Sequence, residues 1–139
     1  MAKPSSAKLA AAAKAALEQA AAPYSKFKVG AAILADDGRI YSGCNVENAA
    51  YPNGVCAETS AISAMVLGGG KRIRAIAVIG GGKNLVTPCG GCRQRIAEFA
   101  TADTPVHVCG PQGPRATFTI GELLPESFGM LNLTARNRS

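Results

Sequence analysis

The hydrophobic and polar positions at the start of the chain predict a helix followed by a β-hairpin. Residues 5–22 are rich in alanine, with leucine and charged positions at helical spacing, and Pro23 follows them, so we expect a helix that ends there. Residues 27–34 and 39–46 are apolar and β-branched on either side of a short Asp-Asp-Gly stretch, which is typical of two strands joined by a turn. The first third of the chain is therefore expected to hold one helix and one hairpin.

The central and carboxyl-terminal positions predict two more helices and three short strands. Residues 56–67 and 88–100 place small or apolar side chains every three or four positions, which is typical of helices. The apolar run 73–79 is nearly continuous, as in a strand that is covered on both faces, and we expect it to be central. Residues 106–109 and 116–120 are shorter strand candidates. This order of elements predicts a layered α/β domain with one mixed sheet.

Length and composition favour a single catalytic domain, residues 1–139, with flexible ends at 1–4 and 134–139. A chain of 139 residues can bury a sizeable core but is short for two catalytic domains. The net charge of +6 is spread along the chain, and its one tight basic cluster, at 71–74, has no interleaved aromatic, so we expect no nucleic-acid partner. No segment resembles a signal peptide or has bilayer length, and we expect a cytoplasmic protein without membrane contact.

Three of the five cysteines form the pattern that carries the chemistry. Cys89 and Cys92 are a Cys-x-x-Cys pair that starts one predicted helix, and Cys56 starts another. Three thiolates at two helix N-termini can hold zinc and leave its fourth position to water, as in catalytic zinc sites. Glu58, two residues after Cys56, is placed to accept a proton from that water. The arrangement fits the all-cysteine form of the zinc-deaminase signature.

On these and further motifs, the sequence resembles the short, homotetrameric cytidine deaminases over residues 23–133. The blocks that carry the resemblance are Tyr24-Ser25-Lys26-Phe27, Val29-Gly30-Ala31-Ala32, Asn45-Val46-Glu47-Asn48-Ala49, Cys56-Ala57-Glu58, Pro88-Cys89-Gly90-Gly91-Cys92-Arg93-Gln94 and Leu123-Leu124-Pro125 with Phe128. The resemblance implies a three-layer fold with a mixed five-stranded sheet flanked by helices. It also implies hydrolysis of cytidine and 2′-deoxycytidine to uridine and 2′-deoxyuridine with release of ammonia, as in pyrimidine salvage.

The resemblance further implies a set of site residues. One zinc ion per subunit would be held by Cys56, Cys89 and Cys92, and Glu58 would pass protons to N3 and to the leaving amine. The implied substrate-binding residues are Phe27, Asn45, Glu47, Ala49, Tyr51, Ala57 and Phe128.

Some of these substrate contacts are implied to cross a subunit interface. Asn45 and Glu47 match the readers of the ribose 3′-hydroxyl, and an amide with a carboxylate can answer both hydrogen-bonding roles of a hydroxyl. Ala49 and Tyr51 match positions that reach the ribose side from a neighbour, and Phe128 matches an aromatic that a neighbouring subunit contributes. The active sites would then be completed within a homotetramer.

Three other functions stay open at this point. A deaminase of another aminopyrimidine nucleoside, such as the blasticidin S deaminases, would share the zinc cluster but need a different reader of the sugar region. A polynucleotide deaminase would need a phosphate-tracking groove with stacking aromatics, and the chain has no Trp. A zinc-stabilised interaction module would close its metal site with a fourth protein ligand.

The sequence departs from the family pattern directly after Glu58. Many relatives have Arg there, which moderates the charge of the thiolates, whereas this chain has Thr59. We expect helix dipoles or Arg93 to take over this role. The single histidine, His107, and the two remaining cysteines lie in strand-like apolar settings and are expected to be structural.

Overall fold

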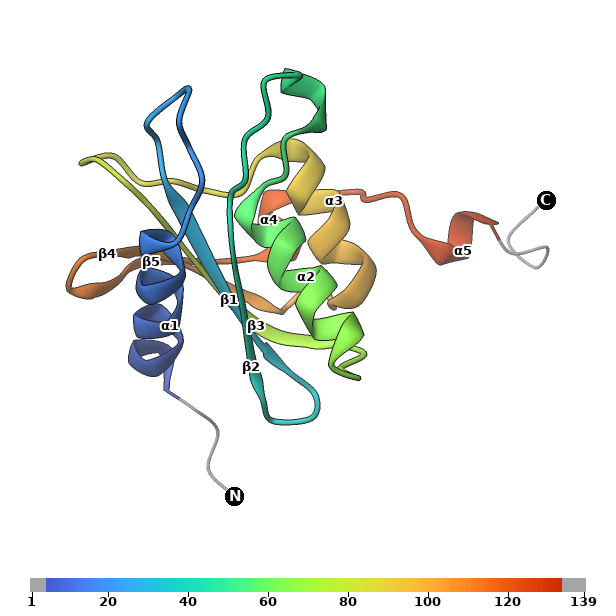
Figure 1. Ribbon diagram of the computed structural model, residues 1–139. Helices are drawn as coiled ribbons and strands as arrows, with labels where there is room; N and C mark the ends of the chain where they lie inside the picture. Colours follow the sequence, from blue (N-terminus) through green and yellow to red (C-terminus); the bar gives the residue numbers. More distant parts are fainter. Residues whose placement is uncertain (1–4, 134–139) are drawn as a thin grey trace.

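Five strands form one mixed sheet in the order β2-β1-β3-β4-β5 (Figure 1). The computed structural model describes residues 5–133, and the ends expected to be flexible lie outside the described residues. The strands are β1 (Val29–Ala35), β2 (Ile40–Cys44), β3 (Ile73–Gly80), β4 (Pro105–Gly110) and β5 (Gly113–Thr119). Among these strands the β3–β4 pair is parallel and the other pairs are antiparallel. The mixed five-stranded sheet and the central strand are therefore confirmed.

Helices cover both faces of this sheet and make it the middle of three layers. Helix α1 (Ser6–Glu18) lies on one face, and α2 (Ala57–Leu67) and α3 (Gly90–Phe99) lie on the other (Figure 1). Because side chains alternate along a strand, Ala32 in β1 packs in the α1 layer while Ile33 packs in the α2 and α3 layer. The predicted three-layer α/β fold is confirmed. No helix within residues 5–133 has the length and apolarity that crossing a membrane requires.

Helix α1 ends earlier than its sequence predicts. Ser5 caps its first turn, but the helix stops at Glu18 although alanines continue beyond it. Tertiary pairing overrides the helical propensity of Ala21, whose backbone N–H donates to Asn45 O at 3.1 Å and whose carbonyl accepts from Glu47 N–H at 2.8 Å. Backbone hydrogen bonds thus join residues 45–47, which include two predicted sugar readers, to the segment that follows α1.

Two glycines allow the helices to approach the sheet closely. A Cβ atom at Gly30 would lie 2.0 Å from Ala13 O in α1, and one at Gly43 would lie 2.4 Å from Ala61 N in α2. Both distances are far below van der Waals contact, so a side chain at either position would displace a helix. Gly43 therefore sets how near α2 lies to the sheet.

Three short helices were not predicted from the sequence. They are the 3₁₀ helix η1 (Tyr51–Asn53), α4 (Ile120–Leu123) and α5 (Met130–Leu133). The predicted strand 116–120 ends one residue early because Thr119 forms a capping box with Glu122 and starts α4. Helix α5 lies away from the sheet (Figure 1).

Candidate metal centre and active site

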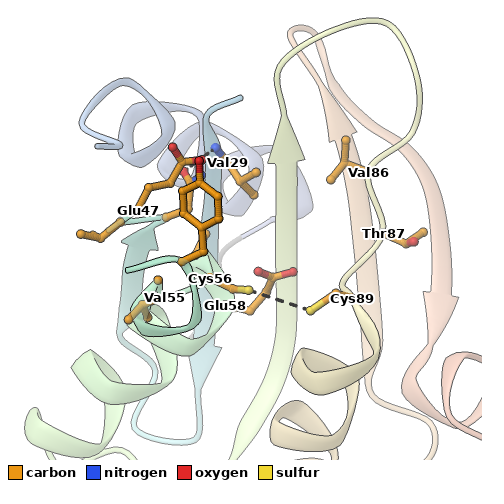
Figure 2. Close-up of a pocket in the computed structure, with 13 residues that line it drawn as sticks. Val29, Glu47, Val55, Cys56, Glu58, Val86, Thr87 and Cys89 are labelled. Atoms are coloured by element: carbon orange, nitrogen blue, oxygen red, sulfur yellow. Dashed lines mark hydrogen bonds between the residues drawn. The ribbon is translucent and has the colours of Figure 1, made fainter. Parts of the chain in front are cut away.

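The three predicted metal ligands meet at the amino ends of α2 and α3. Cys56 is the N-cap of α2, Cys89 is the N-cap of α3, and Cys92 lies in the first turn of α3. Their Sγ atoms all lie within 4.8 Å of one another, and those of Cys56 and Cys89 are 3.9 Å apart (Figure 2). Tetrahedral zinc with Zn–S bonds near 2.3 Å needs sulfurs about 3.8 Å apart. The spacing and the donor chemistry of the three residues therefore fit zinc.

The three thiols differ in their surroundings. Cys92 is fully buried, and this burial is the main cause that raises the pKa of its thiol. Burial also raises the pKa of Cys56, whereas a hydrogen bond from the Cys92 backbone N–H is the main cause that lowers the pKa of Cys89. Since zinc binds thiolates, metal binding releases these thiol protons, and Cys89 is the thiol that ionises most readily.

Glu58 supplies a buried carboxyl beside the sulfur cluster. It lies in the first turn of α2 and is only 4% exposed. Figure 2 shows its side chain between Cys56 and Cys89. Burial raises the pKa of Glu58, because the charged form is disfavoured away from water. A carboxyl in such surroundings can hold a proton and pass it on, which is the property that general acid and base catalysis requires.

A cavity of about 310 Å³ opens onto this cluster. Cys56, Cys89 and Glu58 line it on the metal side, and Asn45 and Glu47 line it on the side of β1 and β2. Its volume lies at the lower end of the range for small-molecule sites, roughly 300–1,000 Å³. The cavity therefore joins two of the three predicted metal ligands, the buried carboxyl and two predicted sugar readers in one space.

The side chains of Asn45 and Glu47 are anchored by backbone groups. Asn45 Oδ1 accepts from Val29 N–H at 2.8 Å, and its Nδ2 donates to Phe27 O at 2.9 Å. The Glu47 carboxylate accepts from Tyr24 N–H at 3.0 Å, and from the backbone N–H and hydroxyl of Ser25. The Ser25 hydrogen bonds lower the pKa of Glu47. Each side chain retains hydrogen-bonding capacity, a donor on the amide and an acceptor on the carboxylate.

The other predicted substrate residues divide into two groups. Tyr51 and Ala57 line the cavity, whereas Phe27, Ala49 and Phe128 are not among its lining residues within 5–133. Phe128 is 57% exposed, and its carbonyl accepts from Gln94 Nε2 at 2.9 Å on α3. Phe128 thus lies outside this cavity, and its contribution to a neighbouring site stays a prediction from the family resemblance.

Six lining residues were not predicted as site residues from the sequence. They are Val29, Val46, Gly54, Val55, Val86 and Thr87. Val55 directly precedes a ligand and Thr87 lies two residues before another, so adjacency to the motif was a usable signal. Val86 follows a glycine-rich stretch without periodicity, and no sequence signal points to it.

Arg93, one of the expected substitutes for the missing arginine, binds oxygen atoms and not the ligand sulfurs. Arg93 directs its guanidinium to three oxygens, Pro88 O at 2.8 Å, Leu123 O at 3.0 Å and Thr87 Oγ1 at 3.1 Å. The side chain that reaches a sulfur is Thr59, whose Oγ1 lies 3.7 Å from Cys92 Sγ. Arg93 thus holds the loop before α3, and Thr59 itself contacts a ligand.

The residues set aside as structural lie away from the sulfur cluster. His107 Nδ1 lies 2.9 Å from Thr117 Oγ1 on the neighbouring strand β5, and burial lowers its pKa. Cys109 is buried in the layer between the sheet and α1, and Cys44 ends β2. Within residues 5–133, the cysteines grouped for a metal are 56, 89 and 92.

Comparison with known proteins defines the class to which this fold and site belong. Residues 4–108 match the model of the cytidine and deoxycytidylate deaminase zinc-binding region. The chain is 46% identical to a cytidine deaminase of Sporosarcina psychrophila, over 91% of this chain and 93% of that protein. It is 41% identical to a cytidine deaminase of Mycobacterium tuberculosis, with 84% of each covered.

Solved structures agree with this classification. The crystal structure of cytidine deaminase from Burkholderia pseudomallei superposes with a TM-score of 0.81 at 43% identity, covering 86% of this chain and 96% of that one. That of the Mycobacterium tuberculosis enzyme gives a TM-score of 0.76 at 41% identity, covering 88% and 95%. The chain belongs to the cytidine and deoxycytidylate deaminase family, and the region that matches includes the three cysteines positioned to hold a metal ion.

Proposed function

We propose that this protein hydrolyses cytidine and 2′-deoxycytidine to uridine and 2′-deoxyuridine, with release of ammonia and one zinc ion per subunit. The observation that carries the proposal is the single cavity that joins a three-sulfur cluster, the buried Glu58 and the pair Asn45 and Glu47. Relatives named cytidine deaminase, which match over most of both chains, support the same reaction.

Glu58 moves the protons of this reaction. The chemistry that zinc supplies when bound is the activation of water for attack on C4, the ring carbon that bears the amino group. Glu58 accepts the two protons of the water in succession, passing the first to N3 and the second to the departing amine, which leaves as ammonia. Its burial keeps bulk water from competing for these protons, and its place between two ligands puts the carboxyl within reach of the reacting atoms.

Asn45 and Glu47 recognise the sugar through one hydroxyl. The free N–H of the Asn45 amide donates to the 3′-hydroxyl oxygen, and the Glu47 carboxylate accepts its proton. The anchoring of both side chains by the backbone of residues 24–29 holds them in place before substrate binds. This pair requires a 3′-hydroxyl and is indifferent to the 2′ position, so both ribose and deoxyribose are accepted.

We also propose a homotetramer in which neighbours complete each site. Tyr51 is 75% exposed beside the cavity and Phe128 is 57% exposed on a segment that extends away from the sheet, and exposed aromatics of this kind are typical of interfaces. Phe128 closes the base side of a neighbouring site, and Ala49 and Tyr51 reach the ribose side of another. Phe27 covers the base within its own subunit. Light scattering should give four times the 14.1 kDa mass of the chain.

The five cysteines carry no disulfide, and a site of three thiolates functions best where thiols stay reduced. We therefore place the protein in the cytoplasm, where uridine released from cytidine returns to pyrimidine salvage.

A turnover assay with a matched variant tests the function. Purified protein is incubated with cytidine, and the loss of cytidine absorbance and the release of ammonia are followed together. Glu58→Gln keeps the volume of the side chain but cannot accept the proton. We expect it to retain one zinc per chain and to lose at least about 100-fold in kcat.

Three results would contradict the proposal. Turnover of blasticidin S without turnover of cytidine would move the protein to the other nucleoside deaminases. Deamination of single-stranded DNA but not of free nucleosides would make it a polynucleotide deaminase. No turnover, together with unfolding on zinc removal, would mark a structural metal site.

A further inference from the structure

The ligand set of this protein raises a problem of charge. Three thiolates around Zn²⁺ carry a net charge of about −1, which weakens the pull of the metal on a fourth ligand. Hydrogen bonds to the sulfurs withdraw part of this charge. Cys92 needs such a partner most, because it is fully buried and water cannot reach its sulfur. The protein itself must therefore supply the donor.

Thr59 is in the position to be that donor. Its Oγ1 lies 3.7 Å from Cys92 Sγ, which is hydrogen-bonding range for sulfur. Thr59 stands in the first turn of α2, whereas Cys92 belongs to α3, so the contact joins the two helices that hold the metal ligands. Once Cys92 is a thiolate it has no proton to give, and the Thr59 hydroxyl must donate.

Two other donors near the cluster have different partners, and Glu58, whose carboxylate is hydrogen-bonded to the Cys92 side chain, is an acceptor in its charged form. Arg93 donates to the oxygens of Thr87, Pro88 and Leu123. The backbone N–H of Cys92 serves the sulfur of Cys89. Within the described part of the chain, Thr59 makes the one side-chain hydrogen bond from a hydroxyl to a cysteine ligand.

We propose that Thr59 is a positioning residue of the metal centre. Its hydroxyl donates to the Cys92 thiolate, withdraws negative charge from the three sulfurs and fixes Cys92 in the tetrahedron. The methyl group of Thr59 is incidental, and the hydroxyl carries the effect. The proposal rests on the zinc-dependent function proposed above, but its main consequence is spectroscopic and does not need turnover.

Cobalt-substituted protein provides the test. Wild type is compared with Thr59→Val and Thr59→Ala, which lack the hydroxyl, and with Thr59→Ser, which keeps it. Thr59→Val and Thr59→Ala differ in side-chain volume, so a packing defect in one of them would not appear equally in the other. Ser60→Ala is the matched control, because the Ser60 hydroxyl donates to Cys44 O at 3.0 Å instead of to a ligand sulfur, and the substitution keeps the backbone hydrogen bond from Ser60 N–H to Cys56 O. The readouts are the sulfur-to-cobalt charge-transfer band and the rate of zinc loss to a chelator.

We expect Thr59→Val and Thr59→Ala to move the charge-transfer band to longer wavelength, because an uncompensated thiolate gives up electron density more easily. We expect zinc loss to be about tenfold faster in both variants. Thr59→Ser and Ser60→Ala should match wild type in both readouts. An unchanged band in Thr59→Val and Thr59→Ala, or an equal shift in Thr59→Ser, would overturn the proposal. If the wild-type protein does not deaminate cytidine, only the proposed function is refuted. The charge-transfer band would still show whether the Thr59 hydroxyl donates to Cys92.

Discussion

Gly43→Ala tests whether the packing of α2 against the sheet sets the position of the metal ligand on that helix. The new Cβ would lie 2.4 Å from Ala61 N and 2.7 Å from Ala57 O. Both are backbone atoms, so no side chain can rotate out of the way. Reaching an ordinary contact of 3.4 Å requires α2 to retreat by about 1.0 Å, the difference between 3.4 and 2.4 Å. Cys56 and Glu58 would move with the helix.

This retreat would separate two halves of the site. Cys89 lies on α3 and would stay in place, so its distance from Cys56 Sγ would grow beyond the present 3.9 Å. A misplacement of about 1 Å costs about 100-fold in rate, and overpacking costs about 1–3 kcal/mol in stability. We therefore expect Gly43→Ala to lose zinc affinity and about 100-fold in kcat, in addition to stability.

Gly30→Ala is the matched control, because it introduces the same methyl group on the opposite face of the sheet. Its Cβ would lie 2.0 Å from Ala13 O in α1, a helix that carries no ligand. We expect a comparable loss of unfolding free energy with zinc content and kcat near wild type. Thermal unfolding, zinc analysis and kcat per bound zinc are measured for both variants. Equal zinc content and equal kcat in the two would refute the reasoning, because the position of α2 would then not depend on this contact.

Three further predictions concern the cavity, the assembly and the metal. Glu47→Gln should raise KM for cytidine at least about tenfold with a smaller change in kcat, because a buried sugar hydroxyl loses a charged acceptor; steady-state kinetics would contradict this by showing a change in kcat alone. Mixing Phe128→Ala with Glu58→Gln chains, followed by unfolding and refolding together, should recover activity if Phe128 acts in a neighbouring site; no recovery would place its effect within its own subunit. Chelation should abolish turnover while circular dichroism stays native, since neither hydrophobic layer is built from a metal ligand; zinc should restore the activity, and global unfolding would contradict it.

The fold could be predicted well where the periodicity of the sequence was strong. The run 73–79 became the central strand, and two cysteine-bearing segments became the helices that position the metal. The errors arose where tertiary contacts overrule local preference. Ala21 leaves a helical sequence in order to pair with residues 45–47, and Thr119 ends a strand by capping a helix.

The site could be predicted only as far as its motif extends. Cys56, Cys89 and Cys92 converge because Cys56 and Cys89 each cap a helix and Cys92 lies in the first turn of the second one, and a helix start can be recognised from sequence. The partner of Cys92 could not be predicted in the same way, because the contact with Thr59 depends on how α2 and α3 pack. The hydrogen bond from Arg93 to Pro88 O, in the loop before α3, could not be predicted either, because it depends on tertiary structure.

The double hydrogen bond of the Asn45 side chain limits how the substrate preference of this protein can be redesigned. The same amide that lines the cavity ties Phe27 O to Val29 N–H, so it also braces the entrance of β1. Replacing it to admit a modified sugar would loosen the wall against which that sugar must rest. Engineering for altered nucleosides is better begun at Val55 or Val86, which border the cavity and have apolar side chains.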